Sequence, residues 1–563
     1  MGHDTIAAPL AVDHEVTRVE KTRKRTLGNV RLRHHETNEI ILIPTPSSDP
    51  NDPLNWPQWY KYYMATVICV AMMVCNFLAA GPSIAMVHIT MDFFNGAHPG
   101  KNPRVFVQAV AKVSYFFTTT ALLQGVGNFF WIPVANKYGR RPTYVISYAI
   151  YFASAIWLSF ERSYGGFLVG RIIMGFGAGA AETVAPITIA DIFFLHERGT
   201  VMALYSSFLA VGIALGLIVS GLITIHHHWR VIFQVASALI GLVLLIAFFA
   251  FPETAYTREV QQSDDEGSSA SISGSGCAGS SSEKGGAIGT SDIERSPSRT
   301  VPTGKRTPYL QTLKIFQSKP LTSENFFKLV VRPLGLIVLP PVLWAALVEA
   351  ATIGFLVAMT SNVEIAFEQA YHFKSWQIGL CFISAIIGSV LGIPVGGKFG
   401  DVVADYFTKR NGGVRDPEMR LPAMIPAMIT SPLALVLFGV AIQNKMHWIV
   451  PTISIALLNF AIVQGTNVAL VYVIDAYRPV AGEITLAVMG FKSLFGFLLS
   501  FYTNTWVSKS GYQNAYGVMA AISAAVLLGW IPLYVWGKRI RHASWSWPVV
   551  SYIHWSDDRE VGE

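Results

Sequence analysis

The chain has 563 residues, of which 52% are hydrophobic and only 14% are Lys, Arg, Asp or Glu. Soluble globular domains carry ~25% charged residues, so this composition excludes a soluble multidomain enzyme. The net charge of +7 does not indicate nucleic-acid binding, because the charges lie between apolar runs rather than in a basic patch. We therefore expect a membrane protein that binds no nucleic acid.

Twelve apolar stretches are long enough to form membrane helices, which need ~20 residues each. Charges inside these stretches are few because an uncompensated charge at the centre of a helix disfavours insertion by ~3 kcal/mol or more. The five charged residues within them are Lys112, Arg171, Glu182, Glu349 and Lys492. The predicted spans cover residues 62–87, 108–134, 143–160, 166–190, 201–224, 231–251, 334–360, 376–396, 422–442, 448–473, 485–507 and 513–536.

A polar segment divides the twelve spans into six and six. Its middle, residues 261–303, is rich in Ser and Gly and predicts disorder. The spacing after Pro308 fits either a short helix on the membrane surface or a loosely packed loop. We predict a cytosolic N-terminal tail at 1–59, a six-helix bundle at 60–254, a cytosolic, largely disordered loop at 255–333, a second six-helix bundle at 334–537, and a cytosolic C-terminal tail at 538–563.

Basic residues predict the orientation of the spans. With the two long segments 1–59 and 252–333 left out, fifteen Lys and Arg fall on the side of the N-terminus and seven on the other side. Short basic loops remain in the cytosol, so both termini are expected to be cytosolic. The predicted location is the cell membrane, crossed many times.

Two loops at matching positions in the halves carry similar residues. The loop after the second span contains Lys137, Gly139, Arg140 and Arg141, and the loop after the eighth contains Gly397 and Asp401. These residues resemble the loop motif of the major facilitator superfamily, and further stretches extend the resemblance, typical of fungal members, over residues 50–540. The resemblance implies an all-α membrane fold of twelve helices in two pseudo-symmetric six-helix bundles, with these six residues in a gating role. Asn136 and Ile132 stand where the motif has an acid and a glycine, which weakens the expected charge-based latch in the first half.

The fifth span carries a glycine pattern at Gly212, Gly216 and Gly221. It resembles a motif of the twelve-span drug:proton antiporters of the superfamily, although Leu217 and Ser220 replace a proline and a glycine of that motif. Small residues four apart also let two membrane helices approach closely whatever the function. Both interpretations, an antiporter signature and simple helix packing, remain open.

The charges inside the spans are candidates for transport. Arg171 and Glu182 lie on one face of the fourth span, with Glu182 deeper by ~16 Å, and Glu349 lies near the middle of the seventh. A desolvated carboxylate can alternate between protonated and charged states, so Glu182 or Glu349 is our hypothetical proton-coupling acid. Arg171 and Lys492 could pair with an acid or bind substrate. The alternative is that the acids only bridge helices.

Three asparagines, Asn76, Asn459 and Asn467, lie in spans 1 and 10, which the resemblance places around a central cavity. They could bind substrate or satisfy a neighbouring helix. His226, His227 and His228 predict an exposed loop rather than a metal site. We expect no cofactor, no metal and no enzymatic activity, and a monomer whose partners are a small-molecule substrate, protons and the lipid bilayer.

The favoured hypothesis is a proton-coupled transporter working by alternating access, which exports a drug, toxin or secondary metabolite. One alternative is an importer of an organic cation or polyamine, since paired acids attract cations. The other is a membrane nutrient sensor that binds without transport and signals through the central loop.

Overall fold

The computed structural model describes residues 51–94, 103–256 and 324–547 without interruption. Outside these ranges it describes residues 30, 31, 44, 46, 47, 49, 50, 308, 312, 314, 321 and 322. The segment predicted to be disordered, 261–303, lies outside the described residues, as does nearly all of the short helix expected after Pro308.

The first half of the chain forms helices separated by short turns. Their starts follow ordinary rules: Ser163 accepts a hydrogen bond from the backbone N–H of Gly166 and so caps the helix that follows. The elements of this half are η1 (Pro53–Asn55), α2 (Gln58–Ala80), η2 (Gly81–Ala85), α3 (Met86–Phe93), α4 (Pro103–Tyr138), α5 (Arg140–Phe160), α6 (Tyr164–Ile192), α7 (Leu195–His226) and α8 (Val231–Ala250).

The second half repeats this pattern. Two prolines, at 340 and 341, start its long first helix, where the missing N–H groups have no intrahelical partner to lose. The elements are α10 (Phe326–Leu336), α11 (Pro340–Tyr371), α12 (Ser375–Cys381), α13 (Ile383–Pro394), η3 (Val395–Phe399), α14 (Gly400–Arg410), η4 (Pro417–Met424), α15 (Ile425–Gln443), α16 (Ile449–Ala476), η5 (Arg478–Val480), α17 (Ala481–Ser510), α18 (Tyr512–Leu528) and α19 (Trp530–Trp545).

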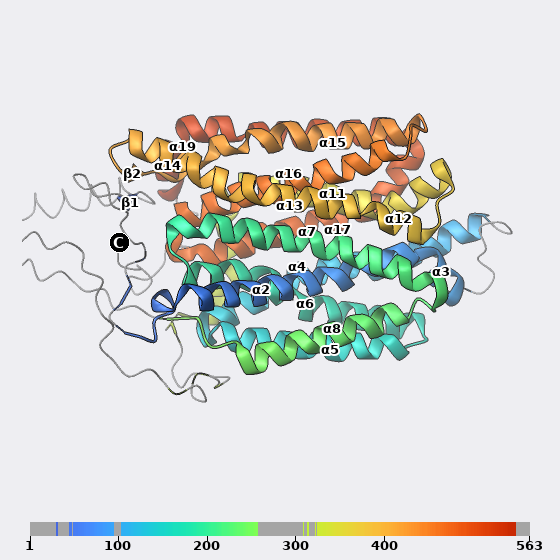
Figure 1. The fold of residues 1–563 in the computed structure, drawn as a ribbon, viewed down its shortest axis with the longest axis horizontal. Coiled ribbons are helices and arrows are strands. Elements are labelled where there is room, and N and C mark those ends of the chain that lie inside the picture. The colour runs from blue at the N-terminus through green and yellow to red at the C-terminus, as the bar shows by residue number, and fades with distance from the viewer. Residues whose placement is uncertain are drawn as a thin grey trace, which may run out of the picture.

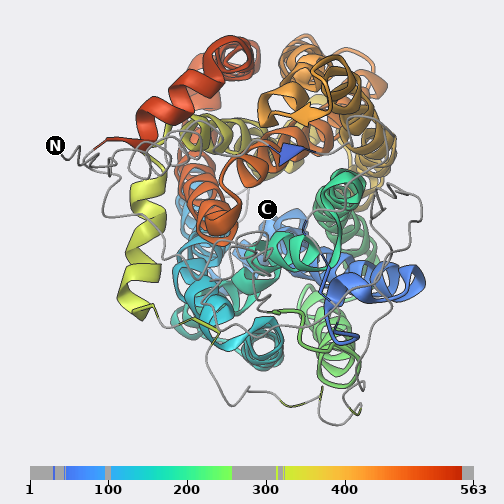
Figure 2. The same ribbon diagram turned by 90° about the vertical axis from the view of Figure 1, so that its left-hand side faces the viewer.

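The two halves lie side by side as two helical bundles (Figure 1), with the N-terminal half in blue to green and the C-terminal half in yellow to red. We call their interface the seam. It is formed by α4 and α6 against α17, and by α7 against α12, α13 and α16. One end of the seam lies on the side of β2 (Val414–Arg415) and α14, at the left of Figure 1 and toward the viewer in Figure 2, and the other lies on the side of α3 and α12. We call the first the Arg140 end and the second the Trp229 end, after one residue at each.

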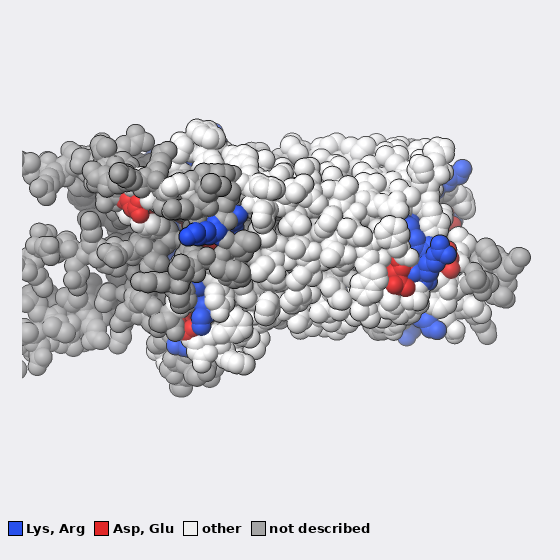
Figure 3. All heavy atoms as spheres, turned by 90° about the horizontal axis from the view of Figure 1, so that it is seen from below, with Lys and Arg blue, Asp and Glu red and all other residues white. Residues whose placement is uncertain are grey.

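The bundle has the dimensions and surface of a membrane-spanning protein. Among the described residues, eleven helical segments are long and apolar enough to cross a membrane. The remaining expected span, α4, has 36 residues and carries Gln124, Asn128 and three threonines, which make it more polar. On the face seen in Figure 3, charged side chains gather toward the two ends and the broad band between them is uncharged. The prediction of twelve spans in two bundles is thus confirmed in its architecture.

Two helices extend beyond the predicted spans, and one strand pairing was not predicted. Helix α10 occupies the end of the segment expected to be loop, and α19 continues to Trp545 rather than ending near 537. Residues Val30–Arg31 form a short strand, β1, paired antiparallel with β2 (Val414–Arg415). Such two-residue pairing leaves no hydrophobic alternation to detect in a sequence.

Candidate functional site

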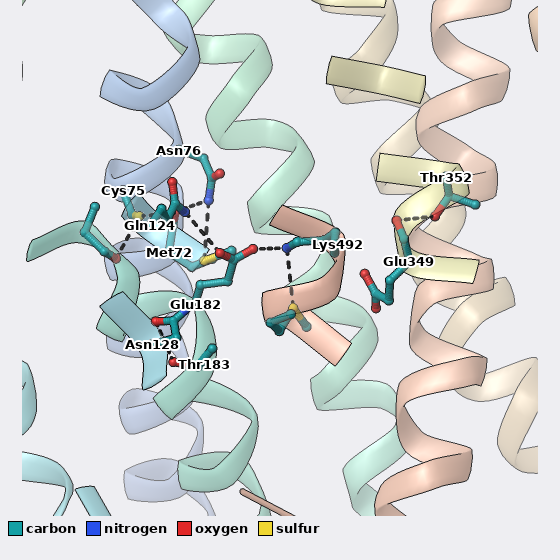
Figure 4. Close-up of polar contacts among 12 residues, drawn as sticks. Met72, Cys75, Asn76, Gln124, Asn128, Glu182, Thr183, Glu349, Thr352 and Lys492 are labelled. Atoms are coloured by element: carbon teal, nitrogen blue, oxygen red, sulfur yellow. Dashed lines mark hydrogen bonds and ion pairs between the residues drawn. The ribbon is translucent and has the colours of Figure 1, made fainter. Parts of the chain in front are cut away.

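The centre of the seam holds an ion pair between the two bundles. Lys492 of α17 contacts Glu182 of α6 through Nζ and Oε1. Their side chains are only 5% and 4% exposed. Figure 4 shows the pair lying between the bundles. Two of the charges singled out in the sequence are therefore brought together, from positions 310 residues apart.

Polar groups from neighbouring helices hold Glu182 in place. Gln124 of α4 donates from Nε2 to Glu182 Oε2 at 3.1 Å, and the hydroxyl of Tyr205 on α7 donates to the backbone carbonyl of Glu182 at 2.6 Å. Cys75 of α2 donates to the carbonyl of Ala178, one turn away on α6, at 3.3 Å. Since three helices converge on this part of α6, the carboxylate has a defined position inside the first bundle.

Glu349 of α11 is the third charge at the centre. It is 1% exposed, and its Oε2 atom has no hydrogen-bond partner among the described residues. Figure 4 shows Glu349 on the side of Lys492 away from Glu182, and it interacts electrostatically with both. The site thus contains two carboxyl groups and one ammonium group, with Lys492 bonded to only one of the acids.

Arg171 lies apart from this group. Its guanidinium is fully buried and donates to the backbone carbonyls of Phe116, Leu78 and Ala79 at 2.9, 3.3 and 3.4 Å. Leu78 and Ala79 belong to the last turn of α2, whose carbonyls lack intrahelical donors. In this conformation Arg171 joins the end of α2 and the middle part of α4 to α6.

The three asparagines have different surroundings. Asn76 and Asn459 are buried and donate to carbonyls of their own helices, those of Met72 and Ile455, at 3.0 and 2.8 Å. Asn467 crosses the seam toward the Arg140 end, where its Nδ2 donates to the carbonyls of Gly199 and Gly396 at 3.3 and 2.6 Å. Asn467 therefore bridges α7 and η3 in this conformation.

The loop from Lys137 to Arg141 forms a polar junction at the Arg140 end. Gly139 has φ of 111°, a left-handed backbone that favours glycine, and a side chain there would collide with Glu253. Arg140 pairs with Asp191 of α6 at 2.9 Å. Arg141 donates to the carbonyl of Phe248 at 2.7 Å, and the carbonyl of Lys137 accepts from the backbone N–H of Leu321 at 3.0 Å.

Glu253 replaces the missing acid of this loop. Its Oε1 and Oε2 accept hydrogen bonds from the backbone N–H groups of Arg140 and Arg141 at 2.8 and 3.2 Å, which caps the start of α5. Burial raises the pKa of Glu253, although these backbone hydrogen bonds oppose the shift. Asp191 and Glu253 therefore supply the carboxyl groups that contact this loop, in which Asn136 stands in place of the acid of the motif.

The matching loop of the second half reaches across the seam. Asp401 accepts from Arg420 at 2.6 Å and from the hydroxyl of Thr200, on α7 of the other bundle, at 3.4 Å. Gly397 packs directly against Thr200: an added Cβ would lie 2.9 Å from the Cα of Thr200. A further pair, Arg198 with Asp475 at 3.9 Å, also joins the bundles here. The seam is thus closed at this end.

The three glycines of α7 make close helix contacts. Gly212 and Gly216 face α2. A Cβ added at Gly212 would lie 2.5 Å from the backbone carbonyl oxygen of Met73, and one added at Gly216 would lie 2.4 Å from that of Phe77. Gly221 faces α12 across the seam at the Trp229 end, where an added Cβ would lie 3.1 Å from the carbonyl of Ser375. All three are packing positions in this conformation, which leaves the antiporter interpretation of the motif untested.

The histidines expected in a loop, His226, His227 and His228, are exposed. Sequence reasoning missed Glu253 as a helix cap. It also missed the pairs Arg198–Asp475 and Asp401–Arg420. The first pair joins positions far apart in the chain and leaves no local pattern.

Known proteins share both sequence and fold with this chain. The sequence pattern of the Major Facilitator Superfamily matches residues 65–498. The chain is 24% identical to the "Uncharacterized MFS-type transporter C1271.10c" of Schizosaccharomyces pombe, over 91% of this chain and 89% of that protein. It is 23% identical to "Protein HOL1" of Saccharomyces cerevisiae, over 91% and 92%. It is 24% identical to "Probable efflux pump mfs2" of Aspergillus flavus, over 73% and 89%.

Solved structures support the same fold. The xylose transporter XylE from E. coli, in a partially occluded inward open conformation, aligns with a TM-score of 0.54 at 14% identity, over 84% of this chain and 97% of that one. The human organic anion transporter MFSD10 aligns with a TM-score of 0.53 at 13% identity, over 84% and 99%. Together with the family pattern, these similarities identify the chain as a membrane transporter of the major facilitator superfamily.

Proposed function

We propose that the protein is a proton-coupled transporter that works by alternating access and exports an organic small molecule such as a drug, toxin or secondary metabolite. The observation that carries this proposal is the buried group of Glu182, Lys492 and Glu349 at the centre of the seam. It joins both bundles and contains one carboxyl group that no described side chain neutralises by a direct bond.

Coupling follows from the cost of burying charge. A carboxylate without a hydrogen-bond partner is unfavourable in an apolar interior, so we expect Glu349 to hold a proton while the centre is closed. Water reaching Glu349 when the seam opens on one side favours release of that proton. A substrate that binds to the ionised acid then takes the place of the proton, and the two species move in opposite directions.

Alternating access requires the two ends of the seam to open in turn. The Arg140 end is held by Thr200–Asp401, Arg198–Asp475 and Asn467, and the Trp229 end by the packing of Gly221 on Ser375. We propose that the Arg140 end faces the cytosol of a cell-membrane protein, because the basic loops lie there. The Lys492–Glu182 pair between the two ends must loosen for substrate to bind.

Export is supported by one relative named as an efflux pump. An importer of an organic cation or polyamine is the second candidate, and a specific observation favours it. The central group, which consists of Glu182, Glu349 and Lys492, contains two acids and a single amine. With both acids ionised it is net negative and attracts a cation. The direction of net transport depends on the gradients rather than on the fold.

The test is proton movement in proteoliposomes that contain the full-length protein and a pH-sensitive dye. Tetraphenylphosphonium, spermidine and benzoate serve as a lipophilic cation, a polyamine and an anion. We expect a cation to evoke proton movement opposite to its own, and Glu349→Gln to abolish the proton signal while binding persists. Glu364→Gln is the matched control: Glu364 is a buried acid on the same helix, bonded to Ser375 rather than to the central group.

Each other outcome has a definite meaning. Substrate movement without any proton movement would make the protein a uniporter and contradict the coupling proposal. Binding without movement of any substrate would favour the sensor hypothesis. Equal loss of the proton signal in Glu349→Gln and Glu364→Gln would show that the central group has no special role in coupling.

A further inference from the structure

Arginines from both bundles gather at the Arg140 end of the seam. Arg198 lies near the start of α7 in the first bundle, and Arg415 and Arg420 lie in β2 and η4 of the second. The three residues are 5%, 7% and 2% exposed. We call this set the arginine cluster. It is separate from the central group in the middle of the seam.

The acids near the cluster are already engaged. Asp475 pairs with Arg198 at 3.9 Å, and Asp401 pairs with Arg420 at 2.6 Å. These two carboxylates offset the charges of Arg198 and Arg420. Among the described residues, Arg415 forms no ion pair. Within the part of the chain that the structure describes, Asp191, Arg478 and His196 also interact electrostatically with the cluster or its acids, and Glu197 lies beside His196.

Several donors of the cluster are unused. Nη2 of Arg415, Nε and Nη1 of Arg420 and Nε of Arg198 are buried and have no hydrogen-bond partner among the described residues. Glycines border the same place. A Cβ added at Gly199 would lie 2.3 Å from Oδ1 of Asp401, the partner of Arg420, and 2.8 Å from Nη1 of Arg420, and one added at Gly400 would lie 3.6 Å from that Nη1. Arginine guanidinium groups present forked N–H donors that suit phosphate-type oxyanions.

Burial also makes the cluster electrostatically unfavourable. Burial lowers the pKa of Arg415 to about 10, and the neighbouring charge of Arg420 adds to the shift. A buried charge is costly unless it is paired, hydrogen-bonded or bound to a counter-ion. Closing the Arg140 end brings Arg198 of the first bundle toward Arg415 and Arg420 of the second, so an anion between them would favour the closed end.

We propose that the arginine cluster is a binding site for a phosphate-type oxyanion that holds the Arg140 end of the seam closed. The oxyanion accepts hydrogen bonds from Arg415 and Arg420 and attracts Arg198 across the seam. It acts as a regulator: it stabilises one conformation and slows the opening that transport requires. Its source is either a soluble phosphate compound or the headgroup of an anionic phospholipid. This site doesn't depend on proton coupling or on the transported substrate.

The experiment measures thermal unfolding of the purified full-length protein in detergent. Sodium phosphate is titrated against sodium chloride at constant ionic strength. Because a ligand that binds only the folded state stabilises it by mass action, we expect the unfolding midpoint to rise with phosphate and to saturate. Arg415→Gln is expected to weaken the apparent affinity about tenfold to a hundredfold, the range for losing a buried charge-assisted hydrogen bond.

Two further variants separate a binding role from a folding role. Arg410→Gln is the matched control, because Arg410 is an exposed arginine only five positions away, and it should retain the full response. Arg415→Lys keeps the charge and should recover part of the affinity. If Arg415→Gln doesn't fold, Arg420→Lys provides the same comparison, since it keeps a cation for Asp401 but removes the forked donors.

The lipid arm uses nanodiscs of phosphatidylcholine alone or with phosphatidic acid. A phosphate response that persists in phosphatidylcholine and disappears with phosphatidic acid would support the site and identify lipid as its source. A response that persists in both would support the site with a soluble ligand. The proposal is overturned if wild type and Arg415→Gln respond alike.

Discussion

Lys492 on α17 pairs with Glu182 on α6, so a single buried contact joins the two bundles in the middle of the seam. Gln124 fixes the same carboxylate from α4. The contact therefore depends on how the bundles are oriented. Any motion that separates the bundles must break it, and water, a proton or substrate must then take the place of Lys492 beside Glu182.

The first prediction concerns this pair. Breaking a buried ion pair by removing one partner leaves an uncompensated charge and costs about 3–5 kcal/mol. We expect Glu182→Gln and Lys492→Met each to lower the thermal unfolding midpoint strongly, and the double variant to be destabilised by clearly less than the sum. Lys112→Met is the control: Lys112 lies over the ring of Phe94 near the other end of α4, so its effect should add to that of Glu182→Gln. Additive effects at 182 and 492 would contradict the pair.

The second prediction concerns closure of the Arg140 end. Gly397→Ala places a Cβ 2.9 Å from the Cα of Thr200 and should hold this end partly open. The measurement is maleimide labelling of Ala203→Cys, a buried position beside Gly397, with the four native cysteines replaced by serine. We expect labelling several times faster than in the parent. Gly400→Ala meets nothing nearer than 3.6 Å and should leave labelling unchanged, whereas equal labelling in both variants would argue against Gly397 as a gate contact.

The third prediction concerns pH. Burial raises the pKa of Glu253, so the folded protein holds this proton more tightly than the unfolded chain does. Stability contributed by this group therefore falls as the pH rises from the usual carboxyl range through the raised pKa, and does not change below that range. Glu253→Gln cannot ionise and should remove this part of the pH dependence. Unfolding midpoints recorded between about pH 4 and about pH 8 test it, and identical pH slopes in both proteins would refute it.

The fourth prediction concerns the glycines of α7. An added Cβ at Gly212 would meet the backbone of Met73 on α2 at 2.5 Å. Because backbone cannot move aside as a flexible side chain can, we expect Gly212→Ala to destabilise the protein by about 1–3 kcal/mol, the usual range for overpacking. Gly517→Ala, where no atom lies within 4 Å, should be neutral or slightly stabilising because alanine favours helix. If Gly212→Ala leaves the stability unchanged, α2 and α7 pack less closely than the 2.5 Å approach to the Met73 backbone implies.

The architecture was predictable because a bilayer-spanning helix requires a recognisable local composition. Runs of ~20 apolar residues, sparse charges inside them and basic loops between them are local features, and each appears in the structure as a helix or a helix end. Helix α10 was missed because a short amphipathic helix at the end of a polar segment resembles neither a span nor a linker. The extension of α19 was missed because its last turns carry charged residues such as Lys538, Arg539 and Arg541, which end the apolar run.

The candidate site was predictable in its members but not in its pairing. Glu182, Glu349 and Lys492 stand out because buried charge is costly. Nothing in the sequence says that Lys492 contacts Glu182 rather than Glu349, since the partners lie 310 residues apart. Arg171 was marked for the same reason, yet its donors go to the backbone carbonyls of Phe116, Leu78 and Ala79, which depend on how the helices pack.

The most direct test of the central claim is substrate accumulation driven only by a pH gradient. Proteoliposomes are prepared with a proton gradient and the membrane potential clamped to zero, and uptake of a labelled cationic substrate is followed for wild type and Glu349→Gln. The account predicts accumulation against the substrate gradient in wild type, and only equilibration in Glu349→Gln with substrate exchange retained. Equal gradient-driven accumulation in the two proteins would contradict it.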